Sequence, residues 1–180
     1  MSSAEFLAWY AARPPDERHE LVDGEIVTMQ SECNRHVLVK NDIWRALDRG
    51  IERAALPCVA LGDGTSVIVD EHDAWGPDAA VQRAVDIDLD ATVIPSPVIV
   101  VEVLSPSTGG VDTGKKLGYF RLESIQHYLV VDPVRCSLVH HRRDGNAIAT
   151  SIAVDGALRL EPPGLELDVA ACFRSIASRR

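Results

Sequence analysis

The sequence predicts an α/β protein in which a mixed β-sheet is flanked by helices. An apolar run at 97–104, PVIVVEVL, is typical of a central strand that is buried on both faces. An Asp-Gly pair at 23–24 lies between two short β-forming runs, as in a hairpin, and a long amphipathic helix is expected from Asn34 onward. Helices placed between and after strands favour a sheet with helices packed against it.

The N-terminal elements follow from a cap and a turn. Ser3 can cap a first helix, which we expect over 3–12. Asp23-Gly24 fits a two-residue type I′ turn, because both positions of that turn require positive φ. The flanking strands are expected at 19–22 and 25–29.

The second helix is expected over 34–55, because Ile43, Leu47 and Ile51 recur at intervals of four residues. A strand at 57–61 then turns through Gly62-Asp63-Gly64 and returns over 65–69. The remaining expected elements are strands at 79–81, 97–104, 127–131, 137–141, 147–154 and 157–160, the last three forming a meander, helices at 112–123 and 168–178, and an acidic connector at 83–96.

Length and composition describe an ordinary globular chain, expected to form a single domain over residues 1–180. The formal net charge of −9 argues against a general DNA-coating protein, since nonspecific binding to phosphates relies on Lys and Arg. It does not exclude an enzyme, because a carboxylate-rich metal site adds negative charge. The four cysteines have no metal-binding or redox spacing, and we find no signal peptide or membrane span. We therefore expect a cytoplasmic protein with reduced cysteines.

Glu102 is the most informative residue, because it is a carboxylate inside the apolar run at 97–104. An ionised carboxylate without a partner is very costly to bury. A metal ion, a basic residue or proton uptake must compensate it. The plainer alternative is that Glu102 lies near the strand end and reaches solvent or a structural salt bridge.

Asp78 is a candidate metal ligand because of its expected position beside Glu102. It follows Gly76-Pro77 and precedes a short apolar strand, and Pro-Asp alone is a common turn pair. Two carboxylates from adjacent strands, with phosphate oxygens and water, would meet the octahedral oxygen demand of Mg²⁺. The pair therefore predicts a site for Mg²⁺ or Mn²⁺, where a bound metal would activate water against a phosphodiester.

A lysine near this pair could polarise the attacking water. Position 104 shares the face of Glu102, but it is a leucine. Lys116 is the candidate instead, from the helix that follows, and Asp112 lies four residues earlier on the same helix face. A surface Asp–Lys pair of little energetic value is the alternative.

Three further residues are candidates for supporting roles. Glu20 could complete the metal site from the hairpin, or it could be an exposed acid. His36 could carry a proton or contact phosphate, or it could be a surface or capping residue. Ser105 could bind phosphate, although capping of the next helix is favoured. The basic run at 140–143 makes a weak patch for nucleic acid, since its residues alternate between faces.

Taken together, these segments resemble the Uma-two-type family of restriction endonucleases, within the PD-(D/E)XK nuclease superfamily. The match covers roughly residues 5–175 and depends on motifs in the family's order and spacing. They are HELVDGEIV at 19–27, NRH at 34–36, GPD at 76–78, VEVLSPST at 101–108, Asp112 with Lys116-Leu117, and HYLVVDP at 127–133. One departure is Tyr128-Leu129, where the family often has Tyr-Trp.

The resemblance implies a restriction-endonuclease-like PD-(D/E)XK core. It also implies that Asp78 and Glu102 bind the metal and that Glu20 supports them. Lys116 would be the superfamily's lysine displaced from the strand into the helix, and His36 corresponds to a histidine frequent in the family.

The leading functional hypothesis is therefore a metal-dependent endonuclease that hydrolyses phosphodiester bonds in DNA. The alternative is a non-catalytic interaction module that keeps the nuclease fold, favoured by the net charge and the scarcity of aromatic residues. A sugar hydrolase with paired carboxylates fits less well, because the lysine has no natural role there. A homodimer is compatible with the leading hypothesis, since many such enzymes cut both strands as two-fold dimers.

Overall fold

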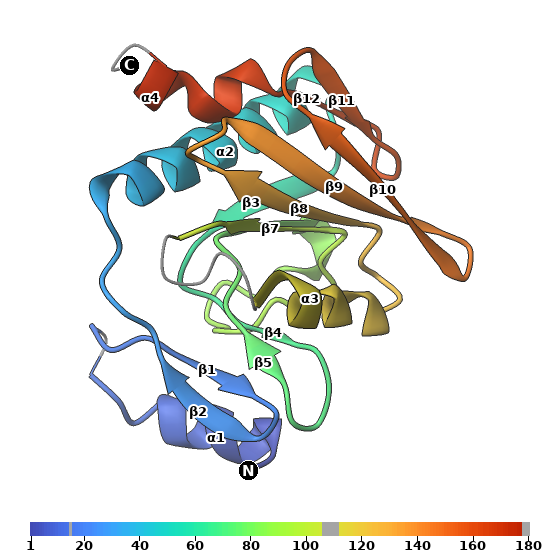
Figure 1. Ribbon diagram of the computed structural model, residues 1–180. Coiled ribbons are helices and arrows are strands. Elements are labelled where there is room, and N and C mark those ends of the chain that lie inside the picture. The colour runs from blue at the N-terminus through green and yellow to red at the C-terminus, as the bar shows by residue number, and fades with distance from the viewer. Residues whose placement is uncertain (15, 106–111, 178–180) are drawn as a thin grey trace.

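The computed structural model describes residues 1–14, 16–105 and 112–177 and contains a six-stranded mixed sheet as its centre (Figure 1). The strand order is β10-β9-β8-β7-β6-β3, and β7 and β8 form its parallel pair. The strands are β3 (Cys58–Gly62), β6 (Ala79–Arg83), β7 (Ile99–Val103), β8 (His127–Asp132), β9 (Ser137–Asp144) and β10 (Ala147–Ala153). The apolar run predicted to be central is β7, which lies between β6 and β8.

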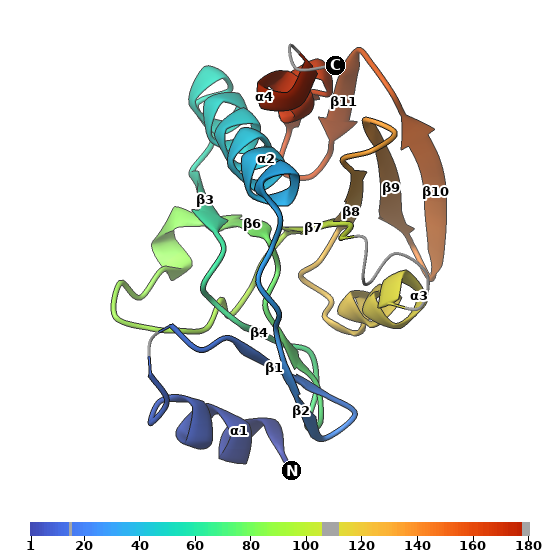
Figure 2. The same ribbon diagram turned by 60° about the vertical axis from the view of Figure 1, so that its left-hand side comes forward.

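Helices cover both faces of this sheet, as the sequence predicts (Figure 2). The long helix α2 (Asn34–Arg53) packs on one face, together with the 3₁₀ turn η3 (Ala170–Phe173) and α4 (Arg174–Ala177). The other face is covered by α3 (Asp112–Lys116) and the 3₁₀ turn η2 (Leu117–Arg121), which form the crossover between β7 and β8. Strand β7 is therefore apolar on both faces, apart from Glu102.

A second, smaller sheet lies beyond α3 and carries the N-terminal hairpin (Figure 1). Its order is β2-β1-β5-β4. The strands are β1 (His19–Val22), β2 (Glu25–Thr28), β4 (Val67–Ile68) and β5 (Ala74–Trp75), and α1 (Ser3–Tyr10) packs against β1. The predicted turn is confirmed, since Asp23 and Gly24 have φ of 51° and 77°. The cap of α1 is Ser2 rather than Ser3, because Ser2 and Glu5 form a reciprocal capping box.

Two predicted strand pairings are wrong. The segment after Gly64 does not return along β3, because β4 pairs with β5 in the smaller sheet. The last predicted strand does not continue the meander either, since β11 (Ala157–Leu160) pairs with β12 (Leu165–Asp168), a strand that the sequence analysis missed.

Two predicted helices are shorter than expected. The helix predicted over 112–123 changes to 3₁₀ geometry at Leu117, and the C-terminal one begins as η3. The short 3₁₀ segment η1 (Ala84–Asp86) lies in the acidic connector. Among the helices described, none is long and apolar enough to cross a membrane.

Candidate active site

The smaller sheet and the central sheet meet around Lys116, at the end of α3. The Lys116 ammonium lies 2.8 Å from Glu102 Oε1 on β7 and 3.0 Å from Glu20 Oε1 on β1. All three side chains are largely shielded from solvent, with Glu102 the most exposed at 15%. The structure thus brings together three of the predicted site residues, each from a different element.

The strand pattern explains why Glu102 points here. Alternate residues of a strand share a face, so Glu102 lies on the side of Val100 and Leu104. Both of these pack in the apolar cluster that contains Tyr119 of η2. The Tyr119 hydroxyl donates a hydrogen bond of 2.8 Å to Glu102 Oε1, a contact that the sequence analysis missed.

Glu20 is fixed from a second direction. The backbone N–H of Gly76 donates a hydrogen bond of 2.8 Å to Glu20 Oε1, the same oxygen that contacts Lys116. Glu20 is therefore a buried residue of this centre, and the alternative of an exposed hairpin acid is wrong.

Asp78 reaches the same region from the neighbouring strand. Ala79 pairs with Val101 in the antiparallel β6–β7 ladder, which puts Asp78 beside Glu102 one position further on. The N–H of Asp78 donates to the Val101 carbonyl at 2.9 Å, and Asp78 Oδ2 accepts a hydrogen bond of 2.7 Å from the N–H of Val103. The two carboxylates are thus held at adjacent positions of adjacent strands.

A second buried lysine compensates Asp78. Lys40 Nζ, from α2, lies 3.0 Å from Asp78 Oδ1 and also pairs with Glu32 and Asp63. Arg18 joins Glu32 and Asp63 from the other side. None of these four residues stands out in the sequence, because an isolated charged residue among polar neighbours gives no signal of burial.

His36 lies one turn before Lys40 on α2 and is buried beside Asp78. Its Nε2 is 3.4 Å from Asp78 Oδ2, and its Nδ1 has no hydrogen-bond partner among the described residues. His36 also lines a hollow of about 320 Å³ with Leu104 and Ser105. The alternative of a surface histidine is therefore wrong.

The other candidates are less informative. Ser105 lines that hollow and lies two residues after the end of β7, where the described part of the following loop stops. Asp112 begins α3, but its side chain lies outside the described residues. The run at 140–143 does not form a basic face, since His140 is buried against His127 and Arg143 donates to backbone carbonyls.

The two carboxylates differ in their ionisation. Burial raises the pKa of Glu102 to about 8, and the charges of Asp78 and Glu20 add to this effect against the opposing ammonium of Lys116. Burial also opposes the charge of Asp78, but His36, Lys40 and the Val103 N–H outweigh it and hold the pKa of Asp78 below its usual value.

The donor set fits a divalent cation. Glu20, Glu32, Asp63, Asp78 and Glu102 carry five negative charges, whereas Arg18, Lys40 and Lys116 carry three positive ones, which leaves two negative charges unmatched when all are ionised. Within the described part of the chain, Oε2 of Glu102 forms no hydrogen bond. Ligand atoms of Glu32, His36 and Asp78 also lie within 4.8 Å of one another, so nitrogen and oxygen donors are both at hand.

Comparisons with known proteins agree with this fold. Two proteins of Synechocystis sp., both called "Uncharacterized protein", are similar in sequence. One, slr1290, is 28% identical over 98% of this chain and 93% of its own length, and the other, sll1609, is 24% identical over 81% and 82%. The crystal structure of "a putative nuclease belonging to DUF820" from Anabaena variabilis superposes with a TM-score of 0.76 at 15% identity, covering 97% of this chain and 98% of that one.

The family comparison covers nearly the whole chain. Residues 3–171 match the family described as "Uma2: Putative restriction endonuclease". This range includes every candidate residue of the site, from Glu20 to Lys116. The chain therefore belongs to the Uma2 family.

Proposed function

We propose that this protein is an endonuclease that hydrolyses phosphodiester bonds in DNA with the help of Mg²⁺ or Mn²⁺. The observation that carries the proposal is the position of Lys116, 2.8 Å from a carboxylate that stands beside Asp78. Carboxylates at neighbouring positions of adjacent strands, with an ammonium in contact with one of them, are suited to hold a cation and to stabilise developing negative charge. Membership of the family and the similar fold support the same reaction class.

Each residue has a defined task in this proposal. Asp78 and Glu102 would hold the metal, which when bound lowers the pKa of its water and neutralises phosphate charge. Lys116 holds a positive charge near the nucleophile and the phosphorane-like transition state. Glu20 keeps the ammonium of Lys116 in place through its contact of 3.0 Å.

Three other residues have positioning tasks. Tyr119 fixes the orientation of Glu102 by donating to its Oε1, and so leaves Oε2 for the cation. His36 and the N–H of Val103 orient Asp78 by their contacts with its Oδ2.

A non-catalytic interaction module is the second candidate, and one observation favours it. Lys40 and Lys116 already pair with Asp78 and Glu102, so the cluster could serve as a structural ion-pair network alone. The two candidates differ in whether the cluster takes up a divalent cation.

The deciding experiment is calorimetric titration with Mn²⁺ of the wild type and of a double variant, Asp78→Asn with Glu102→Gln. We expect saturable binding by the wild type and none by the variant at the same protein concentration. A matched control, Asp86→Asn with Asp88→Asn, replaces two carboxyl groups of the exposed connector and should bind as the wild type does.

Cleavage of plasmid DNA in Mg²⁺ and in Mn²⁺ follows for the same three proteins. Nicking by the wild type and the control, with loss in the double variant, is the expected result. Failure of the wild type to bind Mn²⁺, or equal binding by the double variant, would replace the endonuclease with the interaction module.

A further inference from the structure

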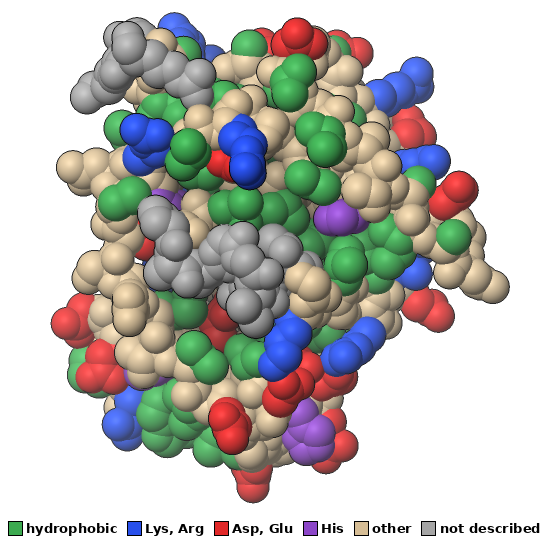
Figure 3. Space-filling view, viewed as in Figure 1, with side chains coloured by type: hydrophobic (Ala, Val, Ile, Leu, Met, Phe, Trp, Pro, Cys, Tyr) green, Lys and Arg blue, Asp and Glu red, His purple; other side chains and the backbone are tan. Residues whose placement is uncertain are grey.

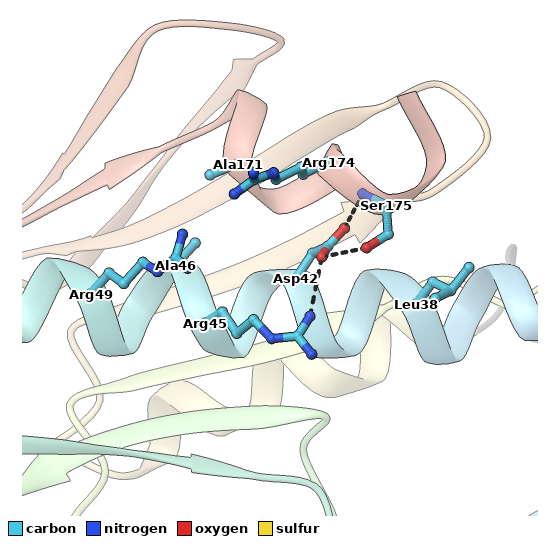
Figure 4. Close-up of a pocket in the computed structure, with 8 residues that line it drawn as sticks. All are labelled: Leu38, Asp42, Arg45, Ala46, Arg49, Ala171, Arg174 and Ser175. Carbon is cyan, nitrogen blue, oxygen red and sulfur yellow. Dashed lines mark hydrogen bonds and ion pairs between the residues drawn. The ribbon is translucent and has the colours of Figure 1, made fainter. Parts of the chain in front are cut away.

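A groove lined by arginines runs between α2 and the C-terminal helices, away from the carboxylate cluster. Arg45 and Arg49 extend from α2, and Arg174 reaches in from the opposite side at the start of α4 (Figure 4). Two hollows, of about 410 and 470 Å³, share Ala46, Arg49, Ala171 and Arg174 and therefore adjoin. Arg53 lines the second hollow, and we call the two together the arginine groove.

Arginines outnumber acids in the arginine groove, since Arg45, Arg49, Arg53 and Arg174 line it beside Asp42 and Asp168. Asp42 is occupied by the N–H and the hydroxyl of Ser175, at 2.6 and 2.7 Å, and by Arg45 at 3.6 Å. Asp168 accepts a hydrogen bond of 3.1 Å from the N–H of Ala170. In the described part of the chain, Arg49 and Arg174 form no ion pair or side-chain hydrogen bond. A chain of net charge −9 thus concentrates unpaired positive charge in one groove.

The spacing of the arginines fits a phosphate backbone. Arg45, Arg49 and Arg53 are four residues apart on one helix, so they follow one another about every 6 Å and span about 12 Å. That length is the axial rise of three to four nucleotides of a strand, at roughly 3.4 Å for each. A guanidinium also matches a phosphate in a bidentate geometry, which an ammonium cannot do.

The walls of the groove favour backbone contacts over base contacts. Alanines at 46, 170, 171 and 177 keep the floor shallow, and none of the described lining residues is aromatic. Stacking on bases needs aromatic or other flat side chains along the path. A ligand held here by guanidinium groups alone would be recognised by its charge, without regard to its base sequence.

The arginine groove points along α2 toward the candidate active site. Arg35 and Arg53 are 18 residues apart, which is about five helical turns, so they lie on the same side of α2. Arg35 lines the hollow that also contains His36, whose Nε2 faces Asp78. The helix α2 therefore carries an arginine beside the hollow of His36 at its N-terminal end and the arginine groove at its C-terminal end.

We propose that the arginine groove binds the sugar–phosphate backbone of nucleic acid outside the catalytic centre, without sequence preference. The choice of nucleic acid as the ligand rests on the proposed endonuclease function. The groove gathers unpaired positive charge in a chain of net charge −9, whereas Lys and Arg elsewhere on the face in Figure 3 are interspersed with Asp and Glu. It holds the substrate while the carboxylate cluster acts on another part of it.

The test measures binding without cleavage. A fluorescent DNA duplex of about 20 base pairs is titrated with protein in EDTA, by anisotropy, over a salt range of about 50 to 200 mM. The variant is Arg49→Gln with Arg174→Gln, because neither side chain supports another residue and the fold should be unaffected. We expect roughly ten- to hundredfold weaker binding at the lowest salt, and a slope of log K against log salt that is smaller by about 1.8.

A matched variant separates the groove from net charge. Arg13→Gln with Arg159→Gln removes two exposed arginines elsewhere, and we expect it to bind within about twofold of the wild type. Equal weakening in both variants, or wild-type affinity and slope in the groove variant, overturns the proposal. So does a wild type that does not bind the duplex at the lowest salt.

Failure of the groove and failure of the endonuclease give different results. If the wild type cuts no DNA in Mn²⁺, but Arg49→Gln with Arg174→Gln weakens its binding to DNA, the groove proposal stands and the endonuclease proposal is wrong. If the wild type cuts DNA and the groove variant binds DNA as tightly as the wild type, only the groove proposal is wrong.

Discussion

Lys40 and Lys116 are both buried lysines that contact carboxylates of the candidate site, yet the carboxylates beside them differ in charge. Lys40 contacts Asp78, whose pKa lies below its usual value, whereas Lys116 contacts Glu102, whose pKa rises to about 8. Burial opposes ionisation in both cases. The difference therefore comes from the remaining neighbours.

Asp78 receives donors from three sides, namely His36, Lys40 and the N–H of Val103. Glu102 receives Lys116 and Tyr119, but it also faces the negative charges of Asp78 and Glu20. The cluster therefore lacks positive charge on the side of Glu102. A divalent cation placed there would complete it.

The largest effect is expected from removing the ammonium of Lys116, which contacts Glu102. Lys116→Met leaves Glu20 and Glu102 buried without their shared partner, and we expect the free energy of unfolding to fall by about 3 to 5 kcal/mol. Urea denaturation measures this loss. The neighbouring Lys115→Met is the control, because that lysine is about half exposed and pairs with an exposed Asp23. A loss smaller than about 1 kcal/mol for Lys116→Met would mean that the pairing contributes little.

Neutralising Asp78 and Glu102 separately should change the stability by different amounts. Asp78→Asn should lower the free energy of unfolding by about 2 to 3 kcal/mol, since Lys40 and His36 lose an ionised partner. Glu102→Gln should change it by less than about 1 kcal/mol near neutral pH, because a carboxyl with a pKa of about 8 is then mainly protonated without metal.

The pH dependence checks the assignment to Glu102. A raised pKa in the folded state means that metal-free stability from Glu102 is lost as the pH rises from about 4.5 through about 8. Glu102→Gln removes that loss, so the variant should be more stable than the wild type in EDTA at about pH 9. Equal stability of the wild type and Glu102→Gln at about pH 9 would contradict the lack of positive charge beside Glu102.

Part of this cluster could be predicted from the sequence. A carboxylate in a strand that is otherwise apolar must have a compensating partner, so Glu102 stands out without any structure. Strand alternation puts position 104 on the face of Glu102, but this position is a leucine. The sequence therefore indicates Lys116, on the following helix, as the lysine of the site. The turn of the β1–β2 hairpin could also be predicted, because Asp-Gly satisfies its backbone requirement locally.

The rest depends on contacts between distant segments. Lys40 meets Asp63 and Asp78, and Tyr119 meets Glu102, only after the sheets have formed. A lysine on an amphipathic helix looks like a solvated residue until its surroundings are known. The β4–β5 pairing was missed for a similar reason, since strands of two residues show no alternation of polar and apolar side chains.

A buried pair of histidines with no carboxylate in contact serves as a reference for the contacts of Lys40 and Lys116 with carboxylates. His127 Nε2 donates to the Pro162 carbonyl at 2.9 Å, so its Nδ1 must accept the hydrogen bond from His140 Nε2, also at 2.9 Å. Burial lowers the pKa of His140 to about 4, and the neighbouring His127, Arg142 and His141 add to this effect.

A base whose pKa is lowered on folding stabilises the protein above its unfolded pKa and loses that contribution as the pH falls. We therefore expect the free energy of unfolding to fall by about 1 to 2 kcal/mol between pH 6.5 and about pH 5. His140→Gln keeps a donor for His127 and should fall less steeply, whereas His72→Gln, which removes an exposed imidazole, should follow the wild type. The opposite pH directions of this pair and of Glu102 have one cause, since each buried group avoids its charged form when no sufficient counter-charge is near. An unchanged slope in His140→Gln would show that the histidine pair tolerates a proton in the folded protein.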